Sequence, residues 1–275
     1  MKRSGFALLS VLWVLVAVGA ITMAGIGNGR LALRATANRR ALAQAAWARE
    51  ACVEIVKSRY ARLQADGVRF ENDRLAERLL QGLTLDSIAL DPGVWCAARA
   101  TDAGSVAHVG RADRAILMCL LRDSVLVERV MEARQLSSGA ALARAQEQAS
   151  PGSSADWRPL GDIGTGQVNV NTASIQVLRC LPGLSDRAAR QVVEARRRLE
   201  GFESLAAMVA AVTPEAAFEI GRHYSELSRV AITRPPQVIL TVFGAAGTVR
   251  PLRATLRLVA LTGSPELVIT AREVE

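Results

Sequence analysis

The run of residues from 6 to 26, FALLSVLWVLVAVGAITMAGI, carries no charged side chain. A helix needs about 20 apolar residues to cross the hydrocarbon core of a membrane, and this run is long enough. It therefore predicts a membrane-spanning helix. Lys2 and Arg3 precede the run. The positive-inside rule then predicts that Met1 stays in the cytoplasm and that everything after Arg30 lies on the far side of the membrane.

Three interpretations of this segment compete. A secretory signal peptide cleaved near Ala20 or Ala24 would have a shorter apolar region, and a plain uncleaved anchor would need no special flanking residues. The third depends on the leader, which is short and basic and ends in glycine directly before a phenylalanine. This arrangement resembles the class III signal of type IV pilins and pseudopilins. The resemblance implies that a prepilin peptidase cleaves between Gly5 and Phe6 and methylates Phe6 as the first mature residue.

The predicted helix continues beyond the membrane. Residues 30–66 contain no proline or glycine. Apolar side chains recur there at steps of three and four residues, as on one face of an amphipathic helix: Leu42, Ala45, Cys52, Val53, Val56, Tyr60 and Leu63. We expect one helix of about 60 residues, on the order of 90 Å long. Its membrane half covers residues 6–26 and its periplasmic half residues 27–66. A glycine cluster predicts fraying or bending between the halves: Gly25, Gly27 and Gly29.

The fifth mature position departs from the usual pilin pattern. Most pilin-like subunits have glutamate there, which neutralises the terminal amine of a neighbouring subunit, whereas this chain has Ser10. A buried charge without a partner is costly, so such a subunit suits the tip of a filament better than repeated positions along it. The missing glutamate makes the chain similar to the K-type minor pseudopilin of type II secretion. That resemblance implies an inner-membrane protein with a periplasmic domain, I-type and J-type partners in a tip complex, and a role in exporting folded proteins.

The rest of the chain predicts an α+β fold. Residues 67–103 and 235–275 are expected to form a pilin-like antiparallel sheet packed on the long helix. Short β-branched or alternating runs supply the strands, at residues 93–100, 238–243, 254–261 and 267–272. Residues 104–234 are expected to be an inserted helical domain, and Pro235-Pro236 marks the return to the sheet.

The inserted domain contains a degenerate repeat. Residues 104–134 resemble residues 166–208, with Cys119 aligned to Cys180, and each copy predicts a short strand followed by two helices. Chance similarity between alanine-rich segments is the alternative. Residues 137–165, rich in Ser, Gly, Ala and Gln, are interpreted as a linker between the copies.

The second copy contains the sharpest motif. Asn169 and Asn171 lie in VNVNTAS, where Asn171 or Thr172 is expected to cap a helix, and a tight turn leads into a second helix over residues 186–199. The turn is Leu181, Pro182, Gly183 and Leu184. This segment resembles a helix-hairpin-helix unit.

Two functions are open to such a unit. In the form that binds DNA, a second glycine lets the backbone approach a phosphate; Ser185 stands there, followed by Arg187 and Arg190. The alternative function is therefore a membrane-anchored receptor for DNA uptake. K-type pseudopilins carry a similar segment that serves packing, and this interpretation is favoured, which makes nucleic acid an unlikely partner. A simple periplasmic structural protein is the third class.

The sequence offers no recognisable catalytic or metal site. His108 and His223 are isolated, so no enzymatic activity, cofactor or metal is predicted. Asp156 and Asp162 are too few to indicate calcium. The net charge of +8 is interpreted as a solvated arginine surface. Four cysteines allow three full pairings and we expect none to form: Cys52, Cys96, Cys119 and Cys180. Exported substrates, partner-contact residues and the oligomeric state before assembly are not specified by the sequence.

Overall fold

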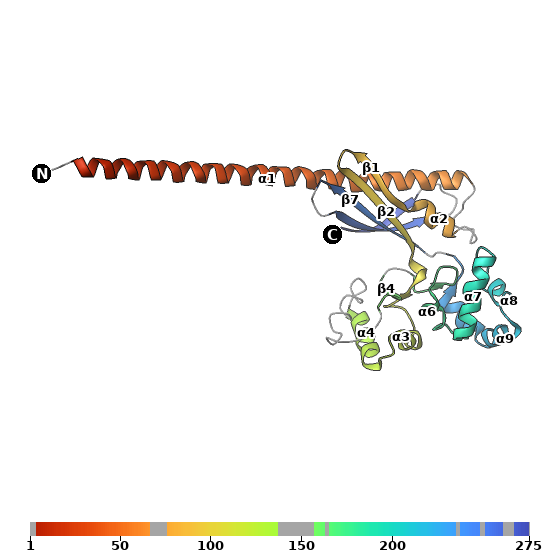
Figure 1. Cartoon of the computed structure of the whole chain (residues 1–275). Coiled ribbons are helices and arrows are strands. Elements are labelled where there is room, and N and C mark those ends of the chain that lie inside the picture. The colour runs from red at the N-terminus through yellow and green to blue at the C-terminus, as the bar shows by residue number, and fades with distance from the viewer. Residues whose placement is uncertain are drawn as a thin grey trace.

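The long N-terminal helix dominates the shape of the molecule (Figure 1). The computed structural model describes residues 4–66, 76–136, 157–162, 165–234, 237–247, 251–260 and 267–274. Helix α1, Ser4–Ala65, is 62 residues long and projects far beyond the sheet. It passes the glycine cluster without a break, so the predicted bend is wrong. Each glycine costs only about 1 kcal/mol, whereas a break would also leave backbone hydrogen bonds unmade.

The sheet has five antiparallel strands in the order β1-β2-β7-β8-β9. Their bounds are Leu85–Asp91, Val94–Asp102, Val238–Ala246, Leu252–Ala260 and Leu267–Val274. The short helix α2, Ala76–Leu83, precedes them and packs on α1. The α+β class with a long helix on an antiparallel sheet is therefore confirmed.

The helix and the sheet share one apolar core. Strands β2 and β7 alternate buried and partly exposed residues, as expected of strands with one covered face. The covered face meets small and medium side chains of α1, among them Ala45, Ala48, Cys52 and Val56. Gly244 of β7 brings the strand against the backbone of α1, because an added Cβ there would lie 2.2 Å from the carbonyl oxygen of Ala45. The two elements thus approach closely where glycine and alanine meet.

Helices fill most of the insertion between β2 and β7 (Figure 1). Its elements are η2 Ala103–Ser105, β3 Ala107–His108, α3 Arg114–Leu121, α4 Ser124–Leu136, β4 Leu160–Gly161, β5 Val168–Asn169, α6 Ile175–Leu178, α7 Asp186–Arg198, α8 Leu205–Ala210, α9 Pro214–Arg222, α10 Tyr224–Val230 and β6 Ala231–Ile232. They enclose an apolar core that shares no residue with the core under the sheet. The insertion is therefore a second folding unit carried by two neighbouring strands.

The two repeat copies have similar element orders. The first runs β3, α3, α4 and the second β5, α6, α7, and each short strand pairs in parallel with another, β3 with β4 and β5 with β6. Leu160–Gly161 belongs to the predicted linker but forms β4, so the linker prediction is wrong for these residues. Residues 137–156, 163–164 and Pro235-Pro236 lie outside the described part of the chain.

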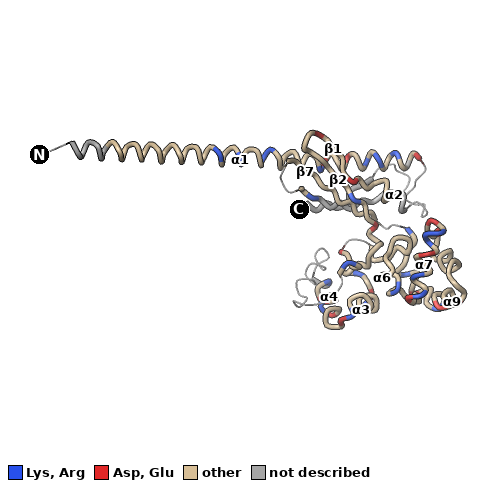
Figure 2. Tube along the Cα trace, viewed as in Figure 1, with Lys and Arg blue, Asp and Glu red and all other residues tan. Residues whose placement is uncertain are grey.

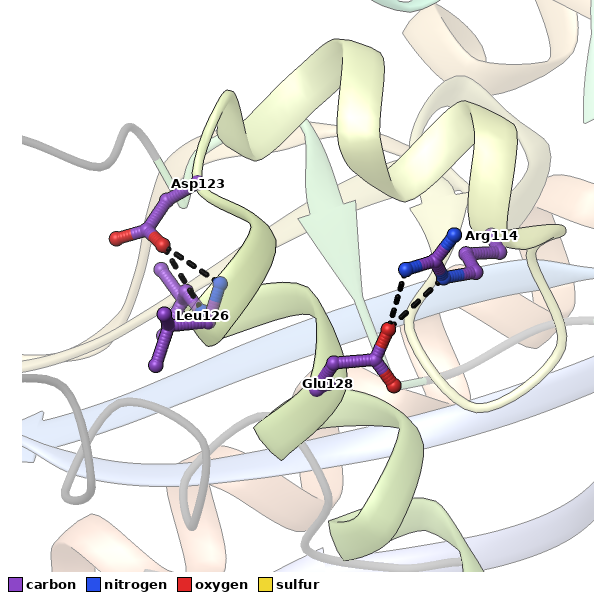
Figure 3. A network of polar contacts seen from close by, with 5 residues as sticks. Arg114, Asp123, Leu126 and Glu128 are labelled. Atoms are coloured by element: carbon purple, nitrogen blue, oxygen red, sulfur yellow. Dashed lines mark hydrogen bonds and ion pairs between the residues drawn. The ribbon is translucent and has the colours of Figure 1, made fainter.

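Polar contacts fix α4 against α3 in the first copy (Figure 3). The Asp123 carboxylate accepts hydrogen bonds from the backbone N–H groups of Val125 and Leu126, which satisfies free donors at the start of α4. Arg114 Nε donates to Glu128 Oε1 at 2.9 Å and joins the two helices on their exposed side.

Candidate functional site

The predicted processing residues lie at the start of α1. Gly5, Phe6 and Ser10 are helical, and the side chains of this stretch are outside those that the structure describes. The following stretch of α1 is apolar enough to cross a membrane, and none of its most apolar window is buried by the rest of the described chain. This segment is the candidate membrane anchor. Cleavage and methylation stay predictions.

Asn171 joins three segments of the inserted domain. Its Nδ2 donates to the carbonyl oxygens of Phe202 at 2.9 Å and Thr233 at 2.8 Å, and its Oδ1 accepts from the Phe202 N–H at 2.8 Å. The predicted capping role is wrong for Asn171 and Thr172. Ser174 caps α6 instead, because its hydroxyl accepts from the Val177 N–H.

Asn169 connects the insertion to the end of strand β2. Its side chain is fully buried, and its Nδ2 donates to Asp102 Oδ2 at 2.7 Å. Asp102 also accepts from the Gly104 N–H at 2.8 Å and from the Thr172 hydroxyl. This group of Asp102, Asn169 and Thr172, here termed the junction network, joins the sheet to the hairpin segment. Nothing in the sequence pattern singles out Asp102.

Arg196 of α7 holds the same loop from the other side. Its Nη1 donates to the carbonyl oxygens of Val170 at 2.9 Å and Ala173 at 2.7 Å. Arg196 follows the hairpin in sequence, as do Arg187 and Arg190, which the DNA-binding alternative would use. Arg196 is instead a structural donor, since buried carbonyl groups need hydrogen-bond partners.

The hairpin turn lies between α6 and α7 and is covered by α9. Leu181 and Leu184 are buried, and Gly183 has a φ of +75°, which favours glycine. A Cβ at Gly183 would lie 3.0 Å from the Cα of Ile220 and 3.1 Å from the carbonyl oxygen of Glu219. The turn therefore packs against the chain's own backbone.

This packing affects the DNA-binding alternative. The Ser185 hydroxyl accepts from the Ala188 N–H at 3.2 Å and caps α7. An open hollow of about 650 Å³ adjoins the turn, and its lining carries both signs of charge: Arg111, Arg229, Asp113 and Glu226. A phosphate site needs an accessible hairpin backbone and an excess of positive charge. The geometry favours the packing role of the hairpin.

A disulfide joins the two repeat copies. Cys119 of α3 is bonded to Cys180, which follows α6, at a sequence separation of 61. The expectation of no disulfide is therefore wrong. Sequence could not select this pair, because Cys52 and Cys96 were equally available; they are free and buried under the sheet. Burial raises the pKa of both thiols, so both stay protonated near neutral pH.

The two histidines have local structural partners. His108 Nδ1 accepts from the Gly110 N–H at 3.0 Å, and His223 Nδ1 lies 3.3 Å from Glu226 Oε2. Within the described residues, no group of three His, Cys, Asp or Glu side chains is placed to hold a metal ion. Asp162 is among these residues, whereas Asp156 lies outside them. The absence of enzymatic activity stays a prediction.

Two comparisons relate this architecture to known proteins. Residues 168–219 match the family model described as Type II secretion system (T2SS), protein K. The fold is similar to a chain in the crystal structure of the GspK-GspI-GspJ complex from the type 2 secretion system of enterotoxigenic Escherichia coli. The TM-score is 0.59 at 13% identity, covering 88% of this chain and 99% of that chain. No curated protein sequence matches significantly. The predicted resemblance to K-type minor pseudopilins is confirmed.

The junction network gives a prediction for Asp102. Burial raises the pKa of this carboxyl, and hydrogen bonds from Thr172, Gly104 and Asn169 offset part of the rise. Because the pKa of Asp102 is higher in the folded state, its protonated carboxyl adds to the stability of the fold. This contribution is fully present below the ordinary pKa of 3.8 and is lost as pH rises through the folded-state pKa. Asp102→Asn should remove this pH dependence, measured by urea unfolding across the pH range. A variant that keeps the wild-type pH slope would contradict the assignment.

Asp102→Ala should also cost stability at neutral pH. The substitution leaves the buried Asn169 amide without its acceptor, and we expect a loss of about 2 kcal/mol after the relief of burying a charge is counted. Thermal unfolding monitored by tryptophan fluorescence measures this loss.

Proposed function

We propose that this chain is a minor pseudopilin of the K type in type II secretion, and that it acts at the tip of the pseudopilus as an assembly subunit rather than an enzyme. The observation that carries the proposal is the family-model match to residues 168–219, which include the whole hairpin segment. The fold match to a chain of the GspK-GspI-GspJ complex supports it over the rest of the molecule. Ser10 adds support, because a subunit without the usual glutamate suits a terminal position.

The proposed partners are I-type and J-type minor pseudopilins. The inserted domain offers a large folded surface beside the sheet, while α1 supplies an apolar segment for packing with sister helices. A complex of the three subunits would start pseudopilus growth and so help to export folded proteins.

The proposed orientation keeps the N-terminus cytoplasmic and the folded domain periplasmic. Its support is the leader that ends at Gly5, whose resemblance implies a peptidase on the cytoplasmic face. The positive-inside rule, from which this orientation was predicted, does not support it once both flanks are counted. Two cations precede the apolar run, Lys2 and Arg3, and four arginines follow it: Arg30, Arg34, Arg39 and Arg40. Processing at Gly5 is therefore the observation that would establish the orientation.

One co-expression experiment tests both parts of the proposal. The full chain is produced with I-type and J-type pseudopilins, with and without the prepilin peptidase, and purified in detergent through a tag on the J-type subunit. We expect the chain to co-purify, and its N-terminal peptide to begin at Phe6 with one added methyl group only when the peptidase is present. Mass spectrometry of the same sample reads both results.

Failure of either part has its own meaning. A chain that is processed at Phe6 but never co-purifies would contradict the tip complex while leaving the pseudopilin assignment intact. A chain that keeps Met1, or is cleaved near Ala24, would contradict the leader assignment.

A further inference from the structure

The stretch of α1 between the apolar segment and the sheet is charged with one sign only. Residues 1–49 contain no Asp or Glu, and the first acidic residue is Glu50. Four arginines lie in this stretch with exposed positions: Arg30, Arg34, Arg39 and Arg40. Figure 2 shows blue bands and no red along α1 before it reaches the sheet. No hydrogen bond or ion pair joins these four to another described residue.

The next cations along α1 behave differently. Arg49 is buried and lies 3.3 Å from Glu50, and Lys57 lies 2.7 Å from Glu54. Arg49 and Lys57 thus each have a carboxylate of the same helix beside them. No carboxylate of the described chain pairs with the four earlier arginines, so they can bind a negatively charged partner.

The arginines surround the helix instead of following one face. At about 100° per residue, Arg30 and Arg34 lie within roughly 40° of each other around the helix axis. Arg39 lies about opposite Arg30, and Arg40 lies on the side of the helix between Arg30 and Arg39 that faces away from Arg34. A neighbouring protein helix would contact one face and leave the others in water. A membrane surface surrounds the whole helix where it emerges, so it can reach all four.

Their heights along the helix fit such a surface. At about 1.5 Å per residue, Arg30 lies about 6 Å beyond Ile26, Arg34 about 12 Å, and Arg39 and Arg40 about 20 Å. The polar headgroup layer is roughly 5–8 Å thick on each side of the hydrocarbon core, and long arginine side chains can reach back along the helix. Charges within about 8 Å of the headgroups still act on them at physiological ionic strength.

We propose that Arg30, Arg34, Arg39 and Arg40 form a basic collar that binds the phosphate groups of anionic phospholipids around α1 where it leaves the membrane. Guanidinium groups suit this role because they bind phosphate oxygens in pairs and stay charged. Leu31 and Leu33 are exposed between them and fit the apolar side of the interface. The collar would hold the subunit at a fixed depth until assembly withdraws it. This inference rests on the proposed function in one respect, that α1 crosses the membrane.

The test uses lipids whose acyl chains carry bromine, which quenches nearby tryptophan fluorescence. The full chain is reconstituted with mixtures of brominated phosphatidylglycerol or brominated phosphatidylcholine. Trp13 is the tryptophan inside the apolar run; Trp47, Trp95 and Trp157 lie far along the chain and give a constant background. Quenching of Trp13 as a function of lipid composition yields the relative affinity of the helix for the two lipids.

We expect an affinity for the anionic lipid about fivefold above that for the zwitterionic lipid at low salt. The preference should decline in about 0.5 M NaCl, where screening is strong. Replacing all four collar arginines by glutamine should bring the ratio close to one. The matched control removes the same charge from exposed positions of α7, with R187Q, R190Q, R197Q and R198Q in one chain, and should keep the preference.

Other outcomes overturn the inference. Equal quenching by both lipids in the wild type, or an unchanged preference in the collar variant, contradicts the collar but leaves the membrane span intact. A collar variant that keeps the lipid preference and loses co-purification with its partners would assign the arginines to an acidic protein surface. Absence of quenching by either lipid would show that α1 does not cross the bilayer, which contradicts the proposed anchoring as well.

Discussion

Replacing Gly244 by alanine is expected to separate strand β7 from α1 while the inserted domain stays folded. The added Cβ would lie 2.2 Å from the Ala45 carbonyl oxygen and 2.5 Å from the Arg49 nitrogen. Both are backbone atoms of a helix, so no side-chain rotation relieves the overlap and α1 must move. We expect a loss of about 3 kcal/mol, the upper end of what overpacking usually costs.

Amide hydrogen exchange of the full chain in detergent measures this effect by region. Strands β2 and β7 and the part of α1 that they cover should exchange faster, since these elements share one core. Helix α7 should be unaffected, because it belongs to the other core.

Gly221→Ala is the matched control for the same substitution. Gly221 lies in α9, and an added Cβ there meets nothing within 4 Å. Alanine should keep stability or raise it by up to about 1 kcal/mol through helix propensity. If the amides of β7 exchange at the same rate in the Gly244→Ala variant as in the Gly221→Ala variant, the close approach of β7 to α1 is contradicted.

The long helix and most strands of the sheet could be predicted, because periodic patterns of apolar residues mark them in the sequence. An uncharged run followed by apolar residues at helical spacing specifies one helix, and alternating runs near the C-terminus specify strands. Strand β1 was missed because its sequence LDSIALD includes three polar residues and few β-branched ones. The eight-residue helix α2 was missed since a short helix gives too few turns for a period to show.

The local features of the hairpin segment could be predicted from the sequence, and its long-range contacts could not. Its turn and the helix α7 were predicted from local turn chemistry, whereas the capping of α7 by Ser185 was not predicted. The role of Asn171 could not be predicted from local sequence, because its partners Phe202 and Thr233 are distant in sequence. Asp102 likewise precedes its partner Asn169 by 67 positions. Gly244 did offer a signal, since glycine inside a strand often marks a close backbone approach.

Removing the Cys119–Cys180 disulfide is expected to loosen the inserted domain and spare the sheet. The bond closes a loop with a sequence separation of 61 residues, and a loop of this length is worth about 4 kcal/mol through the entropy of the unfolded chain. In the double variant C119A and C180A, helices α3, α6 and α7 should lose exchange protection. Strands β2 and β7 should keep theirs, which is the reverse of the Gly244→Ala result.

Reduction of the wild type provides the control for this variant and also tests where the domain lies. Cys52 and Cys96 are already free, so a reductant acts on the one bond between described cysteines and should reproduce the exchange pattern of the double variant. Stability unchanged by both treatments would contradict the expected contribution.

Disulfides persist in the periplasm and are rare in the cytoplasm. Cysteine alkylation in intact cells, followed by mass spectrometry, should therefore leave Cys119 and Cys180 unlabelled. Labelling of both without prior reduction would place the domain in a reducing compartment and contradict the proposed orientation.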